Sequence, residues 1–222
     1  MSQASIRTAA QPPADLWGTM RTARACRSFT ADPVPAGLLA RCLEAATWAP
    51  SGGNQQPWRF AVLQSPGARS AVALGASRSL VTIAETYRLT RPEPGDGSRR
   101  ARMARSVFGL HETAAEVPAA VLFCTRKLPH VSPLLAGASI YPAMQNFLLA
   151  ARASGLGALI TGWHEAAEAE LRETVGVPAD WDLAALVVLG WPRNAFGPVR
   201  RKPVAQVSCL DTWQQPFIGS AD

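Results

Sequence analysis

The spacing of apolar and polar positions predicts three helices and a strand in the first third of the chain. Apolar residues recur every three or four positions in residues 15–25, 34–50 and 66–76, the spacing that gives an α-helix one apolar face. Asp15 stands where an N-cap would accept a hydrogen bond from the first turn. The short apolar run of residues 59–64 is predicted to be a buried strand.

The second half of the chain mixes strands with helices. Strands are predicted at residues 119–124, 156–161 and 183–189, and helices at residues 134–154 and 165–175. A glycine follows each of these helices, as is typical of a helix C-terminus. Because there is no strict strand–helix–strand alternation, the predicted fold class is α+β.

The helix predicted at residues 134–154 is apolar on nearly every side. A helix with this pattern is buried on most sides. In a chain of 222 residues, that favours a central helix that also packs against a second subunit.

Residues 77–105 differ from the rest of the chain. They hold seven arginines with several prolines and glycines, so the centre of this insert is predicted to be a long polar loop. A loop of this length is a lid, a wall of the substrate site or a solvated insert, and these alternatives stay open. Residues 1–14 are predicted to be a flexible arm, and residues 15–217 a single domain.

Composition and charge narrow the function classes. Hydrophobic residues make up 48% of the chain and charged residues 17%, which is typical of a globular protein. The formal charge of +6 would suit nucleic acid, but it suits an anionic cofactor or substrate equally well. Much of the positive excess lies in two local clusters, and we predict no nucleic-acid partner.

The sequence predicts neither a metal site nor a membrane span. The cysteines, at positions 26, 42, 124 and 209, match no zinc spacing, and the histidines do not stand in metal-ligand spacing. The N-terminal residues lack the apolar core of a signal peptide, and no run approaches the ~18 apolar residues of a membrane span. We expect a cytoplasmic protein with reduced thiols.

Residues 49–60 (APSGGNQQPWRF) gather glycines and hydrogen-bonding side chains between the second helix and the first strand. The glycines let a ligand approach the backbone closely, and Ser51, Asn54 and Gln56 offer hydroxyl and amide groups. A turn needs only one or two such residues. The density predicts a loop that binds a polar, planar ligand, and the alternative is a well-capped turn with solvated amides.

Three further motifs carry candidate chemistry. Arg24 and Arg27 form either a clamp for a phosphate or carboxylate or a pair that gains from the helix dipole. Residues 155–163 (GLGALITGW) indicate a helix end and a buried strand, and a Gly-x-Gly without a third glycine is no dinucleotide fingerprint. Residues 200–203 (RRKP) are a basic run of the kind that is usually solvated.

Taken in their order along the chain, these motifs resemble those of the FMN-dependent nitroreductase superfamily over roughly residues 18–217. In that family an Arg-Ser-x-Arg motif binds the FMN phosphate and ribityl chain. Arg24 and Arg27 match this motif, whereas Ala25 replaces the serine, so one hydrogen bond is lost or supplied elsewhere. The family's Pro-Ser-Gly loop contacts the flavin of the other subunit. By resemblance, these contacts fall to Pro50, Ser51, Gly52, Asn54 and Gln56.

The resemblance extends to three more places. The family's Gly-Leu-Gly strand ends beside N5 of the isoalloxazine, which implies Thr161 and Gly162 at the reacting atom. In the family, a basic residue just before a short x-Pro pair meets the FMN phosphate, which implies Arg201 with Arg200 as its neighbour. Ser139 aligns with a position whose side chain reaches the partner's flavin.

The resemblance implies a nitroreductase-like α+β fold, with a central mixed or antiparallel sheet flanked by helices in an intertwined homodimer. It also implies ping-pong electron transfer from NAD(P)H through FMN to a nitroaromatic, quinone or similar small acceptor, with no side chain assigned as a catalytic acid. The rival functions are a flavin-dependent dehydrogenase or ene-reductase of a biosynthetic pathway, and a non-enzymatic flavin or nucleic-acid binder. His164 either lines the substrate space or, as is more common, is a surface histidine.

Overall fold

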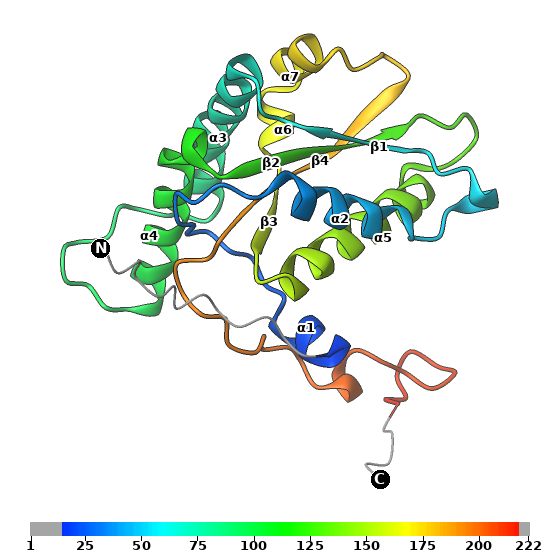
Figure 1. The fold of residues 1–222 in the computed structure, drawn as a ribbon. Coiled ribbons are helices and arrows are strands. Elements are labelled where there is room, and N and C mark those ends of the chain that lie inside the picture. Colours follow the sequence, from blue (N-terminus) through cyan, green and yellow to red (C-terminus); the bar gives the residue numbers. More distant parts are fainter. Residues whose placement is uncertain (1–14, 218–222) are drawn as a thin grey trace, which may run out of the picture.

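The computed structural model describes residues 15–217, so the arm predicted at residues 1–14 lies outside the described residues. A four-stranded antiparallel sheet stands between two layers of helices (Figure 1). In the order β1–β2–β4–β3, its strands are Trp58–Val62, Ala119–Arg126, Trp181–Gly190 and Gly157–Thr161. The sheet therefore matches the antiparallel form of the prediction.

The helices divide between the two faces of the sheet. One face is covered by α2 (Ala36–Thr47) and α5 (Pro133–Ala153), and α1 (Leu16–Thr22) packs beside α5 (Figure 1). The other face carries α3 (Pro66–Thr86), α4 (Arg99–Glu112), α6 (Trp163–Ala166) and α7 (Glu168–Val175). Short 3-10 turns lie at Gly52–Asn54, Ala114–Glu116 and Val204–Gln206. The tail after β4 extends along α1 and away from the sheet (Figure 1).

The apolar run of β2 follows from burial on both faces. Val121 and Phe123 pack in the cluster formed with α2 and α5, whereas Leu122 and Cys124 pack in the cluster formed with α3. Successive side chains of a strand point to opposite faces, so a strand between two helix layers needs apolar residues at every position. β4 repeats this arrangement.

α5 is the central helix that the sequence predicts. Ile140, Met144 and Phe147 are fully buried, and Gly155 ends the helix with a φ of +83°. Contrary to the expectation from the sequence, α5 is long and apolar enough to span a membrane, judged by length and composition alone. The core helix of a folded domain can have the same length and composition, and α5 packs against the sheet and α2.

The centre of residues 77–105 is a loop, as predicted, but helices occupy both ends of this segment. α3 continues to Thr86, and α4 begins after Ser98, whose Oγ accepts the Ala101 N–H at 3.1 Å. The remaining loop spans residues 87–98. Arginine is a good helix former, and buried Ala101, Ala104 and Leu110 give α4 the apolar stripe that docks it. Arginine-rich composition concealed that stripe.

The helix predicted at residues 165–175 is two helices. α6 ends at Ala166, and Ala167 leaves the helical region with a φ of −133° before α7 begins. Gly176 then ends α7 in the left-handed conformation, as predicted.

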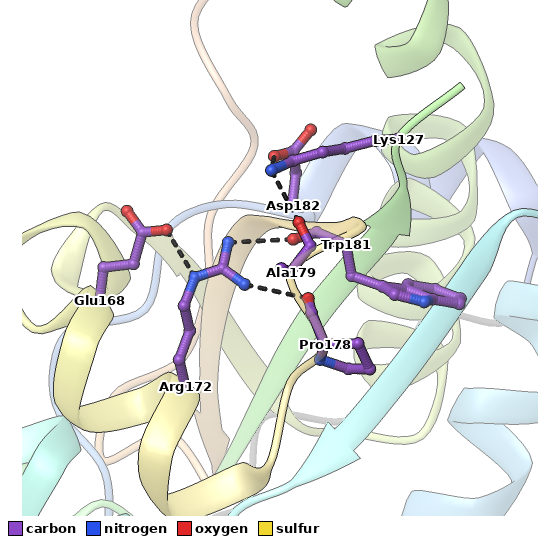
Figure 2. Close-up of polar contacts among 7 residues, drawn as sticks. All are labelled: Lys127, Glu168, Arg172, Pro178, Ala179, Trp181 and Asp182. Atoms are coloured by element: carbon purple, nitrogen blue, oxygen red, sulfur yellow. Dashed lines mark hydrogen bonds and ion pairs between the residues drawn. The ribbon is translucent and has the colours of Figure 1, made fainter. Parts of the chain in front are cut away.

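Arg172 ties α7 to the start of β4 (Figure 2). Its Nε donates to Glu168 Oε1 at 2.8 Å, and its Nη2 and Nη1 donate to the Trp181 and Pro178 carbonyls at 2.9 and 3.3 Å. Lys127 holds the same connection from the end of β2, because its Nζ donates to the Ala179 carbonyl at 2.9 Å. These bonds fix the turn that returns the chain from the helix layer to the sheet.

Candidate functional site

The outer edge of β3 is only partly covered. Its inner edge pairs with β4, and the segment after α1 meets its outer edge at one bridge, between Ala25 and Ala158. There the Cys26 N–H donates to the Ala158 carbonyl at 3.0 Å. Within residues 15–217 no other strand pairs with this edge, and Ile160 is 46% exposed. An open strand edge offers backbone N–H and C=O groups to a ligand.

The two glycines before β3 have structural reasons. Gly155 takes the positive φ that ends α5. A Cβ on Gly157 would lie 2.6 Å from Cys26 Sγ and 2.9 Å from Phe196 Cζ, so only glycine lets these segments close on β3. The Gly-Leu-Gly motif is thus explained by packing, without any ligand.

A pocket of about 330 Å³, which we call the edge pocket, lies between α1, α5 and the outer edge of β3. Arg24, Arg152 and Arg201 line it, and no carboxylate of the described residues does. Arg201 comes from the tail, which is held against α1 where the Val199 N–H donates to the Arg21 carbonyl at 2.8 Å. Three guanidiniums around one concave space favour a phosphate or another multiply charged anion.

Sequence reasoning missed Arg152. Its side chain is 5% exposed, its Nε donates to Thr22 Oγ1 at 3.0 Å, and its guanidinium lies 5.1 Å from the centre of the Phe196 ring. Its Nη1 is buried with no hydrogen-bond partner among the described residues, and burial lowers the pKa of Arg152. A buried cationic donor without a partner is costly, so an anion in the pocket would compensate it. The signal was the single charged residue in a mostly apolar helix.

The structure separates the predicted pair Arg24 and Arg27. Arg24 and Ala25 line the edge pocket, where Ala25 offers no hydroxyl. Arg27 lines two other pockets instead, and burial lowers the pKa of its guanidinium. Arg200 lies outside the edge pocket, exposed, and its carbonyl accepts a bond from Arg201 Nη1 at 3.0 Å.

A second pocket of about 410 Å³, the apolar pocket, lies beyond the end of β3, between α3 and α4. Thr161 and Gly162 line it beside Arg27. Thr161 Oγ1 donates to the Leu186 carbonyl at 3.0 Å, so its hydroxyl proton is not available to a ligand. A Cβ on Gly162 would meet no atom within 4 Å, so the backbone there is open to close approach.

His111 and Trp163 stiffen the wall of the apolar pocket. Trp163 Nε1 donates to His111 Nε2 at 3.0 Å, and His111 Nδ1 lies 2.8 Å from the Val107 carbonyl. Both ring nitrogens of His111 are therefore engaged when the imidazole is neutral with its proton on Nδ1. Burial lowers the pKa of His111, which favours that neutral form.

His164 is not the surface histidine that the sequence favoured. Its side chain is 6% exposed, and burial lowers its pKa. It does not line the apolar pocket, so the alternative role at the substrate space gains no support from its position.

The predicted ligand loop is held in an unusual conformation by its own hydrogen bonds. Gly53, Asn54 and Gln56 have φ values of +56°, +53° and +49°. Ser51 Oγ accepts the Gln56 N–H at 3.0 Å, and Gln56 Nε2 donates to Asn54 Oδ1 at 3.3 Å. Left-handed conformations at non-glycine residues cost energy and cluster at functional sites. The loop thus presents exposed amides in a fixed arrangement.

In one chain, this loop does not meet the edge pocket. Pro50, Ser51 and Gly52 line a groove of about 380 Å³ with Ser139 near the start of α5; we call it the loop groove. It shares no residue with the edge pocket. Residues 139 and 152 are 13 positions apart on α5, which is ~20 Å along a helix. Asn54 and Gln56 are exposed beside the groove.

Comparison with known proteins gives one consistent result. The sequence model of the nitroreductase family matches residues 20–191. A 5,6-dimethylbenzimidazole synthase of Rhodospirillum rubrum is 32% identical over 180 residues, which cover 77% of this chain and 79% of that protein. An NADH dehydrogenase of Thermus thermophilus is 29% identical over 188 residues, which cover 83% and 90%. The fold is similar to that of a nitroreductase with bound FMN from Desulfitobacterium hafniense DCB-2, with a TM-score of 0.65, 18% identity, and 88% and 97% of the two chains covered.

Proposed function

Because the chain belongs to the nitroreductase family, we propose that it is an FMN-dependent oxidoreductase that passes electrons from NAD(P)H to a small organic acceptor. The edge pocket carries this proposal, since three guanidiniums meet there beside the open edge of β3. The buried Nη1 of Arg152 fits a phosphate as its missing partner. The related NADH dehydrogenase and the FMN-bound structure of the same fold support the choice of reductant and cofactor.

When bound, FMN supplies the hydride and electron transfer chemistry. The chain's own task is to hold and orient it. Arg24, Arg152 and Arg201 would bind the phosphate, and the backbone at Thr161 and Gly162 would position the ring. Arg27 stands at the apolar pocket, where its positive charge favours negative charge on a bound ring. The apolar wall excludes water from that side.

The absorption spectrum of the purified protein tests this function. A yellow protein that bleaches on addition of NADPH and regains its colour with a quinone or nitroaromatic is the expected result. A colourless protein that binds no FMN at micromolar concentration would end the proposal. Bound flavin that NADPH and NADH both fail to reduce would leave a non-enzymatic flavin binder.

We propose further that the protein works as a homodimer in which the loop groove of one copy completes the edge pocket of the other. The separation of the two pockets along α5 supports this arrangement, as do exposed Leu134, Leu135 and Tyr141 on the same helix. Exposed apolar side chains gathered on one element are typical of an interface.

A complementation experiment tests the shared site. Arg24→Ala and Asn54→Ala are each expected to weaken flavin binding, because each damages both sites of its own homodimer. A mixed dimer holds one doubly damaged site and one intact site, so unfolding and refolding the two variants together restores about half of the binding capacity in mixed dimers. If both groups act on the same copy's flavin, mixing restores nothing.

A second candidate function has specific support. The relative of greatest identity reported above is a 5,6-dimethylbenzimidazole synthase, which favours a flavin-dependent biosynthetic enzyme on this scaffold. Product analysis separates the candidates. Turnover of nitroaromatic, quinone or enone acceptors supports the reductase, and formation of 5,6-dimethylbenzimidazole supports the synthase.

We place the protein in the cytoplasm. Cys26, Cys42 and Cys124 are buried free thiols and Cys209 is an exposed one. Unpaired thiols suit a reducing compartment. Secretion of the native protein into the medium or periplasm would contradict this placement.

A further inference from the structure

A second basic pocket lies on the far side of Arg27. It measures about 480 Å³ and lies between the segment after α1, the helix α4 and the turn after β4; we call it the α4 pocket. Arg27, Arg105 and Arg193 line it, together with one carboxylate, that of Glu116. Neutral hydrogen-bonding side chains fill the rest of its polar wall: Ser28, Thr30, Ser106, Thr113 and Asn194.

The described residues balance the charge of the α4 pocket only in part. Among the described residues, the guanidiniums of Arg27 and Arg193 make neither a hydrogen bond nor an ion pair, and Arg105 donates to the backbone carbonyl of Asp96 at 2.5 Å. Three cations and one carboxylate leave a positive excess in a concave space. Such a space attracts anions, and the arginine fork matches the oxygens of a phosphate.

The position and size of the pocket indicate which anion. It shares no residue with the edge pocket, so it is separate from the site proposed for the FMN phosphate. It shares Arg27 with the apolar pocket, where we place the flavin ring. Its volume of about 480 Å³ exceeds that of a single phosphate and suits a phosphate with its sugar. A molecule that reacts at the flavin and carries a phosphorylated sugar would reach both pockets.

We propose that the α4 pocket binds the 2′-phosphate ribose of NADPH and gives the enzyme a preference for NADPH over NADH. This inference rests on the proposed function. Arg105 and Arg193 would bind the phosphate oxygens, and Glu116 would accept a hydrogen bond from a sugar hydroxyl. NADH offers no such phosphate, so it forgoes these bonds.

Steady-state kinetics with a quinone acceptor test the preference. The unmodified enzyme is expected to use NADPH with a kcat/KM roughly tenfold or more above that for NADH. Arg105→Ala and Arg193→Ala should each lower kcat/KM for NADPH by roughly tenfold or more and leave NADH within about twofold. Arg99→Ala is the matched control, because Arg99 lies on the same helix, is exposed and lines none of the pockets described above.

A binding measurement tests the pocket without catalysis. Calorimetry with adenosine 2′,5′-bisphosphate should show binding that Arg193→Ala weakens roughly tenfold, whereas adenosine 5′-monophosphate binds weakly to both proteins. Equal use of NADPH and NADH overturns the inference, and so does an equal loss for both reductants in the variants. If the variants lose kcat/KM only for acidic electron acceptors, the pocket binds the acceptor and the inference is overturned. A protein that binds the bisphosphate but no flavin would refute the proposed function and leave the pocket as a phosphate site.

Discussion

Replacing Arg152 with methionine tests whether the edge pocket holds a phosphate. The change removes one of three guanidiniums and keeps an unbranched stem in a site that is 5% exposed. A hydrogen bond to a charged group contributes about 1.5–3 kcal/mol, so FMN affinity should fall roughly 10- to 150-fold. Riboflavin lacks the phosphate, and its affinity should stay within about twofold of the unmodified protein's.

Flavin fluorescence, quenched on binding to flavin-free protein, measures both affinities. Arg152→Lys keeps the charge and should lose less FMN affinity than Arg152→Met. Thr22→Val is the control for local structure, because it removes the acceptor of the Arg152 Nε bond, together with the bond from Thr22 Oγ1 to the Gly18 carbonyl, and keeps the guanidinium in place. The free energy of unfolding of flavin-free Arg152→Met should change by less than about 1 kcal/mol, because the lost Thr22 bond is offset by removal of the unpaired Nη1.

Two results would refute the reasoning about Arg152. Equal losses of FMN and riboflavin affinity would mean that the residue acts through packing and not through the phosphate. Unchanged FMN affinity would remove Arg152 from the site and leave its buried Nη1 without a functional explanation.

Three other predictions concern the fold. Gly157→Ala places a Cβ 2.6 Å from Cys26 Sγ and should lower the free energy of unfolding in urea by about 1–3 kcal/mol, whereas Gly162→Ala, with open space, should leave it nearly unchanged. Burial lowers the pKa of His111, so as the pH drops below about 6.5 this histidine takes up a proton in the unfolded chain while it stays neutral in the folded chain, and the free energy of unfolding falls. His111→Phe should reduce the dependence of the free energy of unfolding on pH by up to ~1.4 kcal/mol per pH unit. Ellman's reagent should react first with exposed Cys209, since burial raises the pKa of the other three thiols to about 11; equal rates for all four would contradict this.

The strands and the central helix could be predicted because their patterns reflect burial directly. β2 and β4 are apolar at nearly every position since both faces of each strand are covered. The break at Ala167 has no such signal, because alanine is the best helix former. Tertiary packing decides it: a Cβ on Gly75 would lie 2.3 Å from the Trp163 carbonyl, so α3 crosses directly over the start of α6. A contact between residues so far apart in sequence leaves no local pattern.

The candidate site could be predicted only in part. Resemblance to a family placed Arg24 and Arg201 at one ligand, and the structure brings both to the edge pocket. Arg27 belongs to the same motif but lines other pockets, because the chain runs beside the outer edge of β3 at Ala25, and residues three apart in an extended segment point to opposite sides. Arg152 carried no motif of its own. Only the packing of α5 beside α1 and the tail makes it part of the pocket.

The positions of the loop groove and the edge pocket along α5 bear on the symmetry of the proposed homodimer. Ser139 lies at the loop groove and Arg152 at the edge pocket, and Gln145 stands exposed about midway between them. In a twofold interface, contacts are reciprocal: if residue i meets residue j, then j meets i. An antiparallel pair of α5 helices with its axis near Gln145 would set residue 139 of each copy opposite residue 152 of the other. One symmetric contact would thus complete two flavin sites at once, and it would account for a chain that carries the loop groove and the edge pocket at separate positions along one helix.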